Sequence, residues 1–192
     1  LNVEPDTKQA QVRVLILVED SPVYYSYFLP LIYREIVKQT QAVLQVGLNE
    51  EHRLLKMRAR PKILLAETYE QGLQLYDRFR DFLIGIISDT RIPKNGKIDN
   101  TGGVKLLKKI RNELPYLPLL LFSAESKNRD KAENIQAVFL DKNSPDLLTE
   151  LHDFFLTHLG FGDFIFRMPD GSEIARASDL RSLEEKVSGI PD

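Results

Sequence analysis

The feature that most constrains the fold is the segment Leu83–Asp89, a short apolar run that contains three isoleucines and ends on a carboxylate. A run this short and this rich in isoleucine is typical of a strand buried on both faces of a parallel sheet. In open α/β sheets, groups at the carboxyl ends of the strands face the binding crevice. Because an Asp after a strand is also a common turn residue, the meaning of Asp89 depends on the rest of the chain.

Four more apolar runs have the same character, and segments with helical periodicity separate them. These four runs are residues 12–18, 62–66, 119–122 and 137–140, which with 83–89 make five. The helical segments are residues 23–38, 68–82, 102–114, 126–134 and 145–159. Pro30 lies inside the first helical segment and should kink it. This alternation predicts an α/β fold, a five-stranded parallel doubly wound sheet of flavodoxin-like order 2-1-3-4-5 with helices on both faces.

The pattern divides the chain into a domain over residues 10–160 and an appendage over residues 161–192. Within the domain we expect an extra, basic helical insert at about 40–61 and a long loop at about 94–101. In the appendage, a Pro-Asp-Gly turn between two strand-like segments, 163–168 and 172–177, predicts a β-hairpin. Ser178-Asp179 then predicts a short helix to residue 187. We expect the appendage to pack on the domain or to link it to a downstream part of a longer protein.

Composition narrows the class of function. With 43% hydrophobic and 28% charged residues the chain of 192 residues is globular. A net charge of −2 and the lack of a helix-turn-helix pattern argue against nucleic acid or an anionic membrane as partner. No apolar run approaches the length of a membrane span, and the absence of cysteine fits a cytoplasmic location.

Polar residues follow four of the predicted strands: Glu19 with Asp20, then Asp89, Ser123 and Lys142. The first and third strands are neighbours in the order 2-1-3-4-5, so three carboxylates should meet at one crevice. Carboxylates this close repel unless a cation lies among them, and Mg²⁺ prefers such oxygen ligands. With the Lys142 ammonium and the Ser123 hydroxyl added, the set suits a phosphoryl group carried on Asp89.

Over residues 12–159 the chain resembles the receiver domain of two-component response regulators. The matching residues are Glu19, Asp20, Asp89, Pro93, Ser123, Ala124, Phe139 and Lys142. The resemblance implies that Asp89 is the phosphoacceptor and that Lys142 contacts the phosphoryl group. It also implies that Glu19, Asp20, Asp89 and the Arg91 backbone carbonyl hold Mg²⁺, and that Ser123 and Phe139 form the conformational switch.

The same resemblance implies a cytoplasmic phosphorelay protein rather than an enzyme. Its phosphoryl donor would be a histidine kinase or a phosphotransfer protein, and its output would be a downstream domain or a protein partner. Homodimer formation is left open. The chain departs from the family in the residues at 94–101, in the basic insert, and at Asn143, where the family has a proline that often follows a cis peptide bond.

Three alternatives accompany this interpretation. The first is a pseudo-receiver that docks partners without being phosphorylated, against which the complete set of acidic residues and lysine argues. The second is a haloacid-dehalogenase-like phosphohydrolase, but that family has Asp-x-Asp after its first strand where this chain has Glu19-Asp20-Ser21. Thirdly, the tail resembles the segment after an N-terminal receiver in proteins related to phosphoenolpyruvate synthase or pyruvate phosphate dikinase, which implies a regulatory front end of a phosphotransfer enzyme.

Overall fold

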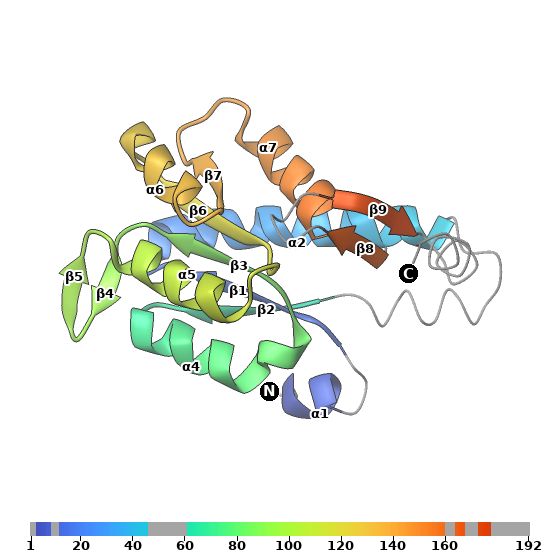
Figure 1. The fold of residues 1–192 in the computed structure, drawn as a ribbon. Helices are drawn as coiled ribbons and strands as arrows, with labels where there is room; N and C mark the ends of the chain where they lie inside the picture. Colours follow the sequence, from blue (N-terminus) through green and yellow to red (C-terminus); the bar gives the residue numbers. More distant parts are fainter. Residues whose placement is uncertain (1–2, 9–11, 46–60, 160–163, 168–172, 178–192) are drawn as a thin grey trace.

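The computed structural model describes residues 3–8, 12–45, 61–159, 164–167 and 173–177. Its centre is a five-stranded parallel sheet of order β2-β1-β3-β6-β7, which confirms the predicted order of the strands along the chain (Figure 1). The strands are β1 (Val14–Val18), β2 (Lys62–Ala66), β3 (Leu83–Asp89), β6 (Leu119–Ser123) and β7 (Val138–Asp141).

Helices cover both faces of this sheet, as the alternation predicted. On one face, α4 (Tyr69–Phe79), α5 (Gly102–Glu113) and the short α6 (Arg129–Glu133) pack on Val14, Ile16 and Val18 of β1 and on their neighbours. On the other face, α2 (Pro22–Gln45) and α7 (Leu147–Asp153) pack on Leu15 and Leu17. Successive residues of a strand point to opposite faces, and both faces of the sheet are covered by helices. Every residue of β1 is therefore buried, and the strand separates two apolar cores.

The first long helix is longer than the sequence predicted. We expected it to end near residue 38, but α2 begins at Pro22, continues across Pro30 and ends at Gln45. The residues that extend it, including Gln39, Gln41 and Ala42, contain no helix breaker and are mostly good helix formers. The start of the expected insert is therefore the end of α2, and the rest of that insert lies outside the described residues.

The prediction of a long loop at about 94–101 is wrong, because most of this segment belongs to a β-hairpin. Strands β4 (Ile92–Lys94) and β5 (Lys97–Asp99) are antiparallel and are joined at Asn95 and Gly96. Both turn residues have positive φ, 52° and 71°, which is the conformation that makes Asn-Gly a strong hairpin signal. The hairpin is held to the start of α4, since the Asn95 N–H donates to Glu70 Oε1 at 2.9 Å and Lys94 Nζ lies 4.0 Å from the centroid of the Tyr69 ring.

Other boundaries also differ from the prediction. The last helix of the domain starts at Leu147 rather than at Pro145 and finishes as a π-helical turn, Phe154–His158. A short N-terminal helix, α1 (Val3–Lys8), was not predicted, and its Glu4 pairs with Arg78 of α4 at 2.8 Å. The 126–134 segment is a 3₁₀ turn, Ser126–Asn128, followed by α6. No peptide bond is cis in the described parts of the chain, including the bond between Lys142 and Asn143.

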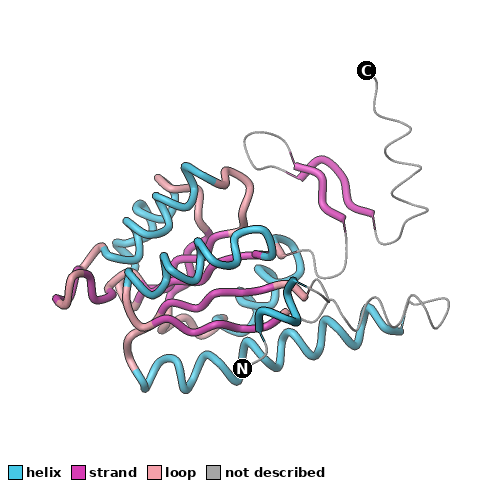
Figure 2. The backbone as a smooth tube through the Cα atoms, turned by 90° about the horizontal axis from the view of Figure 1, so that it is seen from below, coloured by secondary structure: helices cyan, strands magenta, loops and turns pink. Residues whose placement is uncertain are grey.

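In the C-terminal appendage, β8 (Phe164–Arg167) and β9 (Glu173–Ala177) pair antiparallel (Figure 2). This confirms a two-stranded antiparallel element at the predicted place. The turn between the strands, the expected helix to residue 187 and the apolar side chains expected to pack lie outside what the structure describes. Among the helices of the described ranges, none is long and apolar enough to cross a bilayer.

Candidate functional site

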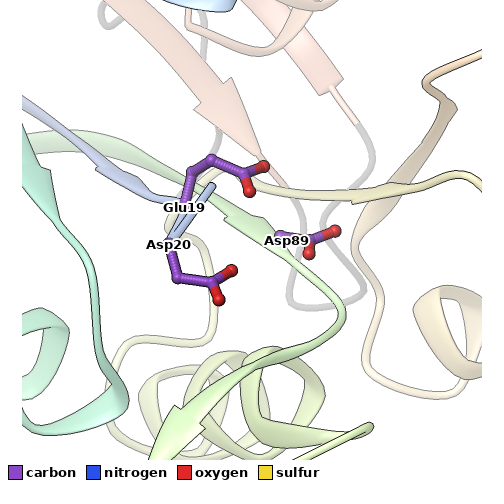
Figure 3. A group of neighbouring side chains, drawn as sticks. All are labelled: Glu19, Asp20 and Asp89. Atoms are coloured by element: carbon purple, nitrogen blue, oxygen red, sulfur yellow. The ribbon is translucent and has the colours of Figure 1, made fainter. Parts of the chain in front are cut away.

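Three carboxylates meet at the carboxyl end of the sheet, as the strand order predicted. Glu19 and Asp20 follow the last residue of β1, and Asp89 is the last residue of β3. The two strands are paired in register, with Val18 opposite Ser88. Each carboxylate has an oxygen that lies within 4.8 Å of an oxygen of the other two, and Figure 3 shows the three side chains gathered around one space.

Lys142 places a buried ammonium inside this cluster. It directly follows β7, and its backbone N–H donates to the Ser123 carbonyl at 2.8 Å, which fixes the chain at the ends of β6 and β7. Its Nζ lies 2.6 Å from Glu19 Oε2 and 3.0 Å from Asp89 Oδ1. The Lys142 side chain is only 2% exposed, so this is a buried charge that requires its two partners.

Burial raises the pKa of both paired carboxyl groups. For Asp89 the loss of hydration outweighs the charge and hydrogen bond of Lys142 and the N–H groups of Thr90 and Arg91, which act in the opposite direction. For Glu19 burial is again the main cause of the raised pKa, and the nearby charge of Asp89 adds to it. Three carboxylates face one ammonium here, so the charge of Lys142 cannot offset all of theirs.

Asp20 differs from the other two carboxylates. It is half-buried, and within the described ranges its carboxylate has neither a hydrogen-bond nor an ion-pair partner. Its oxygens are thus free beside two further carboxylates. An all-oxygen donor set with one unengaged carboxylate fits a hard divalent cation such as Mg²⁺.

A cleft with a volume of about 380 Å³ opens onto Asp89. Basic side chains predominate in its lining, where Arg91, Lys127 and Lys131 join Lys142. Glu125 also lines the cleft and pairs with Lys127 at 3.0 Å. Asn100 also lines it, but no residue of β4 or β5 does so among the described residues. The hairpin is held against α4 and leaves the cleft open to solvent.

The Ser123 hydroxyl lies in the cleft and is connected to the segment that follows β6. It accepts hydrogen bonds from the Asn128 side chain at 2.8 Å and from the Glu125 N–H at 3.1 Å. Asn128 is itself buried, and its Oδ1 accepts from Lys131 Nζ at 2.7 Å. Phe139, the expected switch aromatic, is half-buried on β7, with the Arg129 guanidinium 4.7 Å from its ring centroid.

The structure therefore brings together Glu19, Asp20, Asp89 and Lys142, with Ser123 lining the same cleft. Sequence reasoning missed two other residues of the site, Tyr24 and Asn128, which both line the cleft. Tyr24 lies in the first turn of a helix that starts at the site, so its helical position was a usable signal. For Asn128 the sequence held no comparable signal, because its role depends on how the 3₁₀ turn folds back onto Ser123.

Comparison with known proteins identifies the fold. No protein-family profile and no curated protein matches the sequence. A response regulator receiver domain protein from Clostridium thermocellum has a similar structure, with a TM-score of 0.54 at 13% identity, covering 77% of this chain and 94% of that chain. A two-component response regulator of the LuxR family from Aurantimonas sp. gives a TM-score of 0.50 at 19% identity, covering 78% and 86% of the two chains. At these identities the likeness shows the receiver fold alone, and the expected link to phosphoenolpyruvate synthase-related proteins gains no support.

Proposed function

We propose that residues 10–160 form a receiver domain that accepts a phosphoryl group on Asp89. The observation that carries the proposal is the position of Lys142 Nζ, 2.6 Å from Glu19 and 3.0 Å from Asp89 at the carboxyl ends of adjacent strands. In the transfer, an Asp89 oxygen bonds to the phosphorus of the donor. The bond from phosphorus to the leaving group breaks, and the leaving group departs with the electron pair. Lys142 and Ser123 offset charge on the transferred group.

In this proposal Mg²⁺ binds to Glu19, Asp20, Asp89 and the Arg91 carbonyl. The fit is supported by the three convergent carboxylates and by the unengaged Asp20. When bound, the ion supplies positive charge for the phosphoryl oxygens. The chain's own contribution is to hold the Asp89 oxygen in place, to keep Lys142 beside it and to leave the cleft open to a donor.

The direct test is incubation of the wild-type chain with acetyl phosphate and Mg²⁺, followed by intact-mass measurement. We expect the addition of one phosphoryl group, located on Asp89 by fragmentation. If the mass stays unchanged across donor concentrations and pH, the interpretation as a pseudo-receiver that docks partners without phosphorylation is favoured instead.

Mg²⁺ alone should stabilise the chain, because the cluster contains more negative charge than Lys142 neutralises. At a concentration tenfold above its Kd, a bound ion adds about 1.4 kcal/mol to the free energy of unfolding, or a rise in Tm of about 3 to 6 °C. Asp20→Asn should raise the Tm measured without Mg²⁺ and remove the response to the ion. Thermal melts with and without Mg²⁺ measure both effects.

The matched control for this melt is Asp77→Asn, which removes an exposed carboxylate from α4 and should leave the response to Mg²⁺ intact. If the wild type does not respond to Mg²⁺ while Asp20→Asn raises the Tm, the cluster is repulsive and uses no metal.

We further propose that α6 carries the signal from the site to the surface. Two neighbouring residues at the start of α6 make the relevant contacts. The Asn128 side chain donates to the Ser123 hydroxyl, and the Arg129 guanidinium lies over the Phe139 ring. A phosphoryl oxygen that draws the Ser123 hydroxyl toward Asp89 would therefore disturb Asn128 and, through it, Arg129 and Phe139. The face formed by α6, β7 and α7 is the surface expected to change.

Beryllofluoride, which mimics the phosphoryl group, should change amide hydrogen exchange in residues 126–134 several-fold, and Ser123→Ala should reduce that change because the hydroxyl is the connection. The control is Ser126→Ala in the same segment, since the Ser126 hydroxyl donates to Asp141 at 3.2 Å rather than joining the cleft. A change in exchange confined to the β4–β5 hairpin would mean that the hairpin, and not α6, is the output.

The phosphoryl donor in this proposal is a histidine kinase or a phosphotransfer protein, and the output is a downstream domain or a protein partner. The basic residues around the cleft, Arg91, Lys127 and Lys131, support a donor that presents negative charge. A cytoplasmic location belongs to the same proposal, which the absence of cysteine supports.

A further inference from the structure

An aromatic ring covers the ammonium at the centre of the site. The Tyr24 ring centroid lies 3.9 Å from Lys142 Nζ, and that of Phe28, one turn further along α2, lies 5.8 Å away. Tyr24 lines the cleft and is 37% exposed to solvent, whereas the Lys142 side chain is almost fully buried. Lys142 also lines this cleft, so the Tyr24 ring contributes to the burial of the ammonium at the cleft wall.

Three close neighbours of this ammonium attract a cation. A protonated lysine has three N–H donors, and the carboxylates of Glu19 and Asp89 lie within hydrogen-bond distance of Nζ. The face of the Tyr24 ring is the third neighbour, and it attracts the cation through the negative potential of its π system. A desolvated cation–π contact of this kind is among the stronger ones.

The position of the ring is itself fixed by packing. The Tyr24 ring is stacked on Phe28 at 6.2 Å with an interplanar angle of 18°, and Phe28 is stacked on Phe122 of β6 at 4.4 Å and 19°. Glu19 anchors the start of the same helix, because its Oε1 accepts from the Ser21 N–H at 3.2 Å while its Oε2 holds Lys142. The Glu19 carboxylate thus fixes the position of the Lys142 ammonium and also the start of the helix that carries the Tyr24 ring.

We propose that Tyr24 is a positioning residue that holds the Lys142 ammonium in line with Asp89 and excludes water from it. The proposal rests on the proposed function where it concerns phosphoryl transfer. It follows that the aromatic ring, and not the phenolic hydroxyl, is the required part, and that loss of the ring acts through Lys142 alone.

Acylation of lysines by a water-soluble N-hydroxysuccinimide ester, quantified by peptide mass spectrometry, tests the positioning without any phosphorylation. Lys127, with a side chain that is 75% exposed, serves as the internal reference. We expect Tyr24→Ala to raise the acylation rate of Lys142 relative to Lys127 by about tenfold, and Tyr24→Phe to leave it at the wild-type value. If Tyr24→Ala leaves the ratio unchanged, the carboxylates alone hold the ammonium and the proposal fails.

The matched control is Tyr27→Ala, which removes another tyrosine from the same helix. Tyr27 also contacts Phe28, edge-on at 5.4 Å, so its loss disturbs the same aromatic packing. In contrast to Tyr24, it does not line the cleft within the described part of the chain. Tyr27→Ala should leave the Lys142 rate unchanged; an equal increase would mean that general loosening of α2, and not the ring over the ammonium, is responsible.

A double-mutant cycle connects the ring to the reaction. Tyr24→Ala should slow phosphorylation by acetyl phosphate about five- to tenfold, and should have no further effect in a Lys142→Met background, since residues that act through one contact are not additive. Additive effects would overturn the proposal. A wild type that is never phosphorylated would refute the proposed function, while the acylation ratio would still decide whether Tyr24 positions Lys142.

Discussion

Replacing Asp89 with asparagine should abolish phosphorylation of the chain by acetyl phosphate. The amide lacks the anionic oxygen that bonds to phosphorus. We therefore expect labelling to be absent, and not merely slower. The substitution conserves size and removes one of three mutually repelling carboxylates, but it also removes one of the two partners of the buried Lys142 ammonium. These two effects on the Tm measured without Mg²⁺ oppose each other. Intact-mass measurement over a time course checks the loss of labelling, and a melting curve confirms that the variant is folded.

Asp141→Asn is the matched control for this result. Asp141 also ends a strand of the same sheet, but its carboxylate accepts from Ser126 and from the Asn143 N–H and lies outside the cleft lining. This variant should be labelled like the wild type. Equal labelling of Asp89→Asn and wild type would place the phosphoryl group on another residue and refute the assignment.

Replacing Gly103 with alanine should destabilise the chain more than any surface substitution. A Cβ at this position would lie 1.7 Å from the Asp89 carbonyl oxygen and 2.7 Å from Ser88 Oγ. The Gly103 N–H donates to the Thr90 carbonyl at 3.1 Å, so the first turn of α5 packs directly on the backbone of the site. Because backbone must shift, we expect a loss of about 3 kcal/mol in the free energy of unfolding, which corresponds to about 6 to 12 °C in Tm.

Gly72→Ala separates this clash from the general effect of adding a methyl group to a helix. Gly72 is also a buried helical glycine, but its Cβ would meet side-chain atoms rather than backbone. These are the end of Leu106 at 2.9 Å, which can move, and Val18 Cγ2 at 3.2 Å. The gain in helix propensity of about 1 kcal/mol then offsets much of the crowding. Denaturant unfolding of both variants measures the difference; similar losses would mean that the backbone approach at Gly103 is relaxed at little cost.

Much of the fold was predictable because the buried strands appear in this sequence as short, almost wholly apolar runs. The run Leu83–Asp89 and the fully apolar β1 can only be central strands, and the observed order confirms this. Boundaries were less predictable where competing signals were weak. We expected the first long helix to end near residue 38 and to kink at Pro30, but α2 continues to Gln45. The packing of Phe28, Ile32 and Ile36 on the sheet holds the helix on both sides of Pro30.

The acidic part of the site was predictable for a topological reason, since adjacent parallel strands bring Glu19, Asp20 and Asp89 to one edge. The contacts of Lys142 with a ring and of Ser123 with Asn128 were not predictable. They depend on the orientation of helix starts and on a 3₁₀ turn, which neither periodicity nor spacing specifies. Asn95-Gly96 was a readable hairpin signal that was missed because the segment was treated only as an insertion.

The β4–β5 hairpin has a consequence for how the chain reaches its native state. The pairing of β1 with β3 joins residues as distant as Val14 and Leu83, and closing such a long segment of chain is slow. The hairpin adds only local pairs, from Ile92 with Asp99 to Lys94 with Lys97, which form on a microsecond timescale. The extra residues beside Asp89 thus add short-range contacts, lower the relative contact order and leave the slow assembly of the parallel sheet as the step that sets the folding rate.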